Sequence, residues 1–209
     1  MKLWSILFAV FGLLVLTSCA RAPQFAPSQL APSEWQLDPT HASIIFRVDH
    51  AGGLSRFTGR FDRFDAALFF DAAQPTNSKV SVHIEAHSIN TGVPVLDKKL
   101  VEHNRALAAK EYPIIRFESE GISNIDGHTA MVNGTLTLRG VTLPITLHTK
   151  WNGTSFDPLR RAQVLGFSAQ TEFDRTLFGA DAWKNFGVGT KIDVQIEVEF
   201  LKRTSQKED

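Results

Sequence analysis

The residue with the clearest chemical signature in this chain is Cys19, its single cysteine. It ends the tetrapeptide Leu-Thr-Ser-Cys, which follows a nearly continuous apolar run over residues 3–16 with Lys2 before it. The run has the length of a signal-peptide core and is shorter than the roughly 20 apolar residues of a membrane-spanning helix. The tetrapeptide resembles the bacterial lipobox, in which cleavage before the cysteine exposes a thiol that is acylated. We therefore predict a signal peptide over residues 1–18 and lipidation, palmitate included, at Cys19.

Two other interpretations of this segment stay open: an ordinary secretory signal that ends near a cysteine, and a buried free thiol. Ala20 follows the cysteine, whereas an Asp there would resemble the inner-membrane retention signal of enteric bacteria. We expect a periplasmic protein that its lipid anchors to the outer membrane. The alternative is a soluble periplasmic or secreted protein.

The remaining reactive side chains do not suggest a catalytic or metal site. His83 and His87 lie four residues apart on a predicted strand and would share a face, but the phase of Val82 and Ile84 turns that face to solvent. No other cysteine and no spaced cluster of His, Asp and Glu completes a metal-ligand set. The sequence also lacks a nucleophile elbow, a haem-attachment motif and a phosphate-binding glycine loop. We predict that the protein is not an enzyme and binds no metal and no cofactor.

Composition limits the partners and the domain organisation. The 22 Lys and Arg residues balance 22 Asp and Glu residues, so there is no positive field of the kind that nucleic acid attracts. Removing the signal leaves about 190 residues without a cysteine, which suits one domain without disulfides. Prolines in an Ala, Gln and Ser-rich stretch predict a linker over 19–34, followed by a domain over 35–203 and a polar tail over 204–209.

Alternation of apolar and polar residues with a period of two predicts strands through most of the domain. The pattern is clearest at 44–49, 79–86 and 191–200, and recurs at 57–61, 68–70, 115–119, 132–138, 143–151 and 165–173. Turn signals separate the strands at 51–53, 75–78, 126–127, 139–140 and 152–153. Residues 95–110 have a helical spacing of apolar side chains, and a short non-strand segment is expected near 177–183.

About eight antiparallel strands with one helical insert predict an all-β sandwich or a closed up-and-down barrel. We favour the barrel, because closure removes the exposed sheet edges. The 16 Phe and 4 Trp residues, against 1 Tyr, predict a bulky apolar interior. A barrel of this size is either filled by its own side chains or holds one small ligand, and both remain open at this point.

Six motifs, in order along the chain, resemble those of the YceI-like family, also called polyisoprenoid-binding proteins. They are Trp35–Asp38 with His41–Ser43 and Phe46; His50 with Gly53 and Phe57–Phe61; Ser88–Gly92 with Asp97 and Leu100; Tyr112–Ser119; Gly134–Pro144; and Gly166–Ala169 with Asp174–Arg175. The resemblance implies an extended lipocalin-like antiparallel barrel whose apolar tunnel holds a long isoprenoid chain, such as a quinone tail or polyprenyl phosphate, without chemistry on it. It also implies a periplasmic location and allows a homodimer. The helical insert departs from many relatives, since it lacks their paired Phe residues.

A tunnel would be lined by the inward apolar side chains of the strands. We predict as its lining Phe46, Phe57, Phe61, Ile84, Phe117, Leu136, Leu138, Phe167, Phe173 and Val194, with Leu100 and Phe178 near its mouth. Each of these could instead be plain core. The resemblance suggests His50, Asp97 and Arg175 as contacts of a ligand head group. Each also has a purely structural explanation: a turn carbonyl for His50, the exposed start of the helix for Asp97, and pairing with a nearby acid for Arg175.

Two functions follow as hypotheses. The first is a membrane-tethered protein that binds an isoprenoid lipid or quinone, for storage, transport or stress protection. The second is a tethered structural or interaction barrel with a self-filled core and no ligand.

Overall fold

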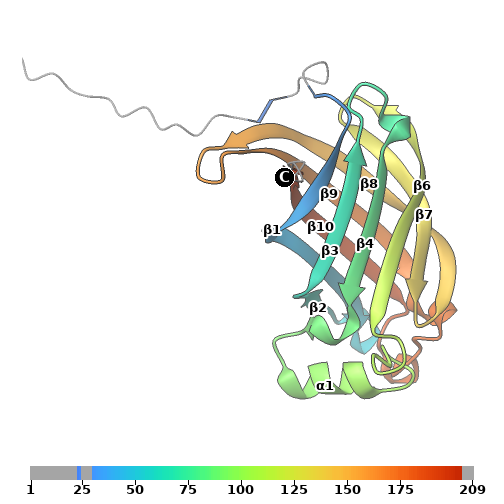
Figure 1. The fold of residues 1–209 in the computed structure, drawn as a ribbon. Helices are drawn as coiled ribbons and strands as arrows, with labels where there is room; N and C mark the ends of the chain where they lie inside the picture. Colours follow the sequence, from blue (N-terminus) through green and yellow to red (C-terminus); the bar gives the residue numbers. More distant parts are fainter. Residues whose placement is uncertain (1–22, 25–29, 204–209) are drawn as a thin grey trace, which may run out of the picture.

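The computed structural model describes residues 23–24 and 30–203 (Figure 1). Cys19, the predicted signal peptide and the predicted polar tail lie outside the described residues. The elements are β1 (Ser33–His50), β2 (Ser55–Phe61), β3 (Phe64–Phe70), β4 (Lys79–Glu85), β5 (Ile89–Asn90), α1 (Pro94–Glu102), β6 (Ile114–Asp126), β7 (Thr129–Leu138), β8 (Val141–Asp157), β9 (Ala162–Asp174) and β10 (Lys191–Lys202). Among the described residues, no helix is long and apolar enough to cross a membrane.

The strands form a closed antiparallel barrel, which confirms the predicted fold. The sheet runs in the order β10, β9, β8, β7, β6, β4, β3, β1, and β1 pairs back onto β10, so that within residues 30–203 eight strands complete the ring. Both β2 and β3 pair with the long strand β1. The first half of β1 pairs with β3, and its second half pairs with β2. β5 adds a two-residue pairing beside β2. α1 lies across one end of the barrel (Figure 1).

Side-chain alternation follows the predicted phase, because successive residues of a strand face opposite sides of the sheet. In β7 every second residue is buried, from Val132 through Leu136 to Leu138. Two buried clusters result. One gathers Trp35, Leu68, Trp151, Leu165 and Phe200, and the other, in the half of the barrel nearer α1, gathers Ile115, Leu136, Leu138 and Phe178.

The turn between β7 and β8 has the predicted form. Arg139 and Gly140 both have positive φ, 54° and 73°, as a two-residue hairpin that matches the twist of its strands requires. The turn predicted at Asn152 and Gly153 was wrong. β8 continues through both residues, and Gly153, with φ of 111°, sits where the register to β9 shifts. A glycine with positive φ serves a β-bulge as well as a turn, and here the chain reverses only after Asp157.

Three other boundaries differ from expectation. The helix covers Pro94–Glu102 and not 95–110; it begins at a proline and ends where His103 turns extended, with ψ of 124°. β4 ends at Glu85, so His83 lies on the strand but His87 lies in the short helix Ala86–Ser88, and the two do not share a strand face. Leu30, within the stretch predicted as a linker, is 6% exposed and packs in the core with Trp35.

Candidate functional site

An apolar cavity of about 230 Å³ lies inside the half of the barrel nearer α1. Inward side chains of the strands make its wall, and the loops beyond α1 and β9 make its floor through Leu107, Ala182 and Trp183. These two loops are joined to each other, because the Ala182 N–H donates to the Arg105 carbonyl at 2.8 Å. Loop segments therefore border the cavity at this end, and the sheet borders its sides.

A second apolar cavity of about 240 Å³ occupies the other half of the barrel. Its wall includes Phe70, Trp151 and Phe167, and the turns at the end opposite α1 border it. Four residues line both cavities: Ile44, Val82, Leu147 and Ile196. We call these four the waist. The two cavities thus adjoin at the waist inside the barrel, and their volumes together fall within the usual range of ligand pockets, about 300–1,000 Å³.

The predicted tunnel residues fall into three groups: those that line the first cavity, one that lines the second, and two that line neither. Nine line the first cavity: Phe46, Phe61, Ile84, Leu100, Phe117, Leu136, Leu138, Phe173 and Val194. Phe167 lines the second cavity. Phe57 pairs with Val48 in the register of β1 and β2 but borders neither cavity. Phe178 is buried behind Phe173, with ring centroids 5.4 Å apart. Contact with a ligand stays a prediction for all of them.

Arg175 is the charged residue of the predicted set that reaches the cavity. It is 8% exposed and lines the first cavity where the loop after β9 covers it. Nε donates to the Gly189 carbonyl at 2.7 Å, Nη2 to the Val188 carbonyl at 3.2 Å, and Nη1 to the Ala180 carbonyl. Burial lowers the pKa of the guanidinium, and the charges of Asp181 and Asp174 oppose that shift. The side chain is thus a buried cation held by main-chain oxygens, and it does not pair with Asp174 through hydrogen bonds.

The other two head-group candidates lie elsewhere. Asp97 is in the first turn of α1, where its Oδ1 accepts hydrogen bonds from the Thr91 N–H at 2.8 Å and the Thr91 hydroxyl at 2.6 Å. It borders a shallow surface pocket separate from both cavities. His50 is exposed at the end of β1 and borders neither cavity. The structure does not bring these two residues to Arg175.

Sequence reasoning missed the waist and the loop residues of the floor. The alternation pattern marked Ile44, Val82 and Ile196 as inward. Alternation along a strand does not show which inward residues of different strands lie at the same height in the barrel, because that height depends on strand register, which could not be predicted. Trp183 carried no pattern signal because it lies in a loop, with φ of 57°.

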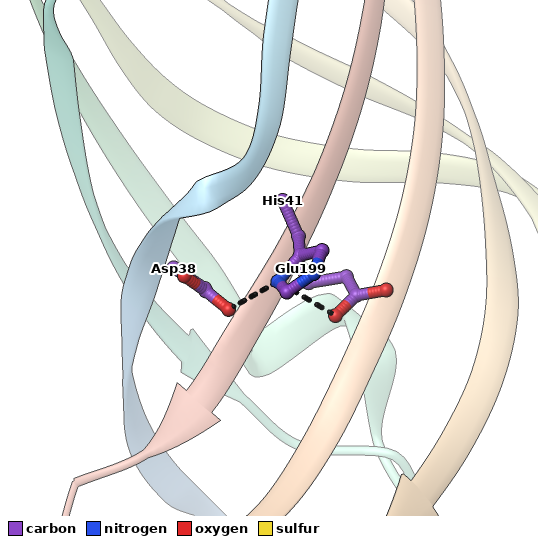
Figure 2. Close-up of side chains that lie close together, drawn as sticks. All are labelled: Asp38, His41 and Glu199. Carbon is purple, nitrogen blue, oxygen red and sulfur yellow. Dashed lines mark hydrogen bonds and ion pairs between the residues drawn. The ribbon is translucent and has the colours of Figure 1, made fainter. Parts of the chain in front are cut away.

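A polar cluster forms where the two ends of the domain meet (Figure 2). His41 Nδ1 lies 2.7 Å from Asp38 Oδ2 and 3.9 Å from Glu199 Oε2, and the three ligand atoms lie within 4.8 Å of one another. Burial raises the pKa of Asp38, but hydrogen bonds from His41 and Thr40 outweigh it and leave the pKa below its usual value. Arg160 Nη1 is 2.9 Å from Asp38 Oδ2. Because this guanidinium already balances the carboxylate, we assign no metal to the cluster.

A YceI-like domain model matches residues 35–200 of this chain. The UPF0312 protein of Pseudomonas aeruginosa (strain LESB58) is 34% identical over 182 residues, which cover 85% of this chain and 88% of that protein. The UPF0312 protein of Shewanella denitrificans is 32% identical over 167 residues, 79% of this chain and 86% of that protein.

Solved structures share the fold. A mutant of the Campylobacter jejuni YCEI protein superposes with a TM-score of 0.65 at 27% identity, over 72% of this chain and 88% of that one. A domain from Saccharophagus degradans, described as polyisoprenoid-binding and implicated in plant cell wall breakdown, superposes with a TM-score of 0.60 at 15% identity, over 83% of this chain and all of that one. The second likeness concerns the fold alone. The residues that the family model matches run from within β1 to within β10 and so cover the barrel, and the chain belongs to the YceI-like family.

Proposed function

We propose that this protein binds a long isoprenoid chain, of the quinone or polyprenyl phosphate type, inside its barrel and does no chemistry on it. The observation that carries the proposal is the pair of apolar cavities that meet at the waist. A self-filled barrel would leave no such space along its interior. Apolar surface removed from water contributes about 25 cal/mol per Å², so a chain that fills this space is held strongly and leaves slowly. The Saccharophagus degradans domain of the same fold supports the ligand class.

Arg175 gives the proposed ligand a direction. The guanidinium has five N–H donors, and it stands at the α1 end of the first cavity. A phosphate placed there would compensate the buried positive charge, and a quinone carbonyl would accept a hydrogen bond from the guanidinium, whereas an isoprenoid tail would do neither. The head group therefore lies at the α1 end, and the tail extends through the waist toward the second cavity.

We also propose that Cys19 is acylated and that the protein works on the periplasmic side of the outer membrane, in storage, transport or stress protection. The lipobox-like tetrapeptide supports the anchor. Growth with an alkyne analogue of palmitate, followed by mass spectrometry of the N-terminal peptide, should place the label on Cys19. A Cys19→Ser variant should carry none, and label found elsewhere would contradict the assignment.

The test of ligand binding uses the mature chain from Ala20, exported behind a cleavable non-lipoprotein signal and purified from a bacterial periplasm without detergent. Mass spectrometry of an organic extract should find an isoprenoid or quinone in about one-to-one ratio with protein. Light scattering on the same sample reports whether a homodimer forms. An empty extract that stays empty after incubation with farnesol and octaprenyl alcohol would favour the interaction barrel instead.

A further inference from the structure

The hairpin between β8 and β9 exposes two large apolar side chains. Leu159, at the tip, is 94% exposed and Phe156, on the arm, is 62% exposed. Arg160 and Arg161 follow Leu159 directly. The hairpin projects beyond the neighbouring strands at the end of the barrel far from α1 (Figure 1). A protruding tip with apolar and basic side chains side by side is suited to the boundary between lipid head groups and acyl chains.

The tip is held in a fixed conformation. Asp157 Oδ1 accepts hydrogen bonds from the main-chain N–H groups of Leu159, at 2.8 Å, and Arg160, at 3.1 Å. The Arg160 guanidinium contacts Asp38 at 2.9 Å and donates to the Thr40 hydroxyl at 2.7 Å, which joins the tip to the polar cluster of Figure 2. The cluster therefore anchors the hairpin against β1, and Leu159 is presented outward by a rigid turn. A rigid apolar tip inserts with little loss of conformational freedom.

The N-terminal segment approaches the barrel beside this hairpin. The main chain of Gln24 pairs with Thr154 on β8 in both directions, at 2.8 and 2.9 Å. Gly153 makes room for it, since a Cβ there would lie 3.0 Å from both the Gln24 carbonyl oxygen and Pro23 Cβ. Five peptide units join Gln24 to Cys19, and a chain spans at most about 3.6 Å per residue, or about 18 Å in all. An acyl group on Cys19 thus keeps Gln24, which is paired with β8, within about 18 Å of the membrane surface.

We propose that Leu159 and Phe156 insert into the bilayer that holds the acyl chains of Cys19, and that Arg161 meets its phosphate groups. The identity of the membrane in this inference rests on the proposed lipidation of Cys19. The exposure of the hairpin tip does not depend on lipidation, because it is a feature of the fold. The barrel is then oriented with its β8–β9 end on the membrane and its α1 end away from it. The alternative occupants of the tip, a second copy or another protein, are outcomes of the test.

The experiment reads the position of a label on the full acylated protein. Cys19 is the chain's single cysteine, so once it is acylated a Leu159→Cys variant offers one free thiol for a nitroxide. The matched control is Leu54→Cys, because Leu54 is 86% exposed and lies in the turn between β1 and β2 at the α1 end. In vesicles of phosphatidylethanolamine and phosphatidylglycerol, the label at 159 should become accessible to oxygen and protected from a water-soluble nickel chelate. The label at 54 should stay in water.

Equal water exposure of both labels would overturn the proposal, and so would insertion of the label at 54. Immobilisation of the label at 159 without vesicles, together with a dimer by light scattering, would identify the tip as a contact between copies. A second measurement tests insertion of the tip without any contribution from the acyl anchor. The unacylated chain from Ala20 is mixed with the same vesicles, and its membrane-bound fraction is measured by flotation. Leu159→Glu should lower its membrane-bound fraction at least tenfold while its extractable isoprenoid content stays unchanged. Failure of palmitate labelling would remove the anchor and leave this comparison valid, whereas an unchanged bound fraction would refute insertion.

Discussion

Blocking the waist tests whether one ligand crosses both cavities. Val82, on β4, borders the two cavities, and Val82→Phe would place a ring in the cavity space at the boundary that they share. Because the ring enters a void, the free energy of unfolding should change by less than about 1 kcal/mol. The matched control is Leu165→Phe, at a position that is 0% exposed and packed in the core. There the added volume has no space, and overpacking should cost about 1–3 kcal/mol.

The size of the effect on binding follows from the cavity that the ring cuts off. The second cavity, about 240 Å³, holds on the order of eight groups the size of a water molecule at about 30 Å³ each. At about 0.8 kcal/mol per buried methylene, filling it contributes up to about 6 kcal/mol. If ordering the tail costs about half of that, the net loss on blocking the waist is about 3 kcal/mol, or roughly 100-fold in affinity.

The assay compares a short and a long ligand, farnesol and an octaprenyl alcohol, by competition in native mass spectrometry. The unsubstituted protein should prefer the long chain, and the Val82→Phe variant should keep its affinity for farnesol while its preference for the long chain falls about 100-fold. An unchanged preference would show that the tail does not cross the waist. Loss of farnesol binding as well would show that the short ligand does not sit in the first cavity alone.

Three further perturbations test the packing around the cavities. Gly134→Ala should lower the free energy of unfolding by about 2 kcal/mol or more in urea titrations, because the added Cβ would stand 2.2 Å from a carbonyl oxygen of β6; Gly121→Ala, with open space around it, should change little, and equal effects would contradict this reasoning. A hydrogen bond from Arg105 is the main cause that lowers the pKa of Asp181 to about 2. The stabilisation that the ionised Asp181 carboxylate provides is therefore complete above the unfolded-state pKa near 4 and is lost as the pH falls toward 2. Asp181→Asn should therefore be less stable at neutral pH, with a gap to the unsubstituted protein that closes between about pH 4 and pH 2, and a gap independent of pH would refute the assignment. Arg175→Met leaves three carbonyls without their donor and should cost about 3 kcal/mol or more in thermal unfolding; a neutral result would show that the loop after β9 does not depend on this side chain.

The fold was predictable because its signal is local and repeated. Alternation along each strand identified the inward face, and the need to remove sheet edges favoured closure, which the pairing of β1 with β10 provides. Features that depend on register were not predictable. The pair Asn152 and Gly153 has the same local preference in a turn and in a bulge, and only the continued pairing with β9 decides between them.

Parts of the site were invisible for a related reason. Arg175 could be named from the sequence, but its partners are main-chain oxygens of a loop, which no side-chain pattern reveals. The contact between His41 and Glu199 joins residues from opposite ends of the domain, and it exists because the barrel closes there. Asp97 and His50 stood in the expected order along the chain, yet they lie outside both cavities.

The seam between β1 and β10 also sets when the protein can fold. The first and last strands of the domain pair over ten positions, from Trp35 with Lys202 to Val48 with Ile192. The barrel therefore cannot close until β10 has been synthesised and has paired with β1. Contacts this distant in sequence form slowly, and until they form, two apolar strand edges are open to other chains. A truncation before Lys191 should therefore aggregate instead of yielding a weakened barrel. The same seam places both ends of the domain side by side, so a circular permutant with its ends joined and new termini in the turn at Arg139 and Gly140 should retain the fold.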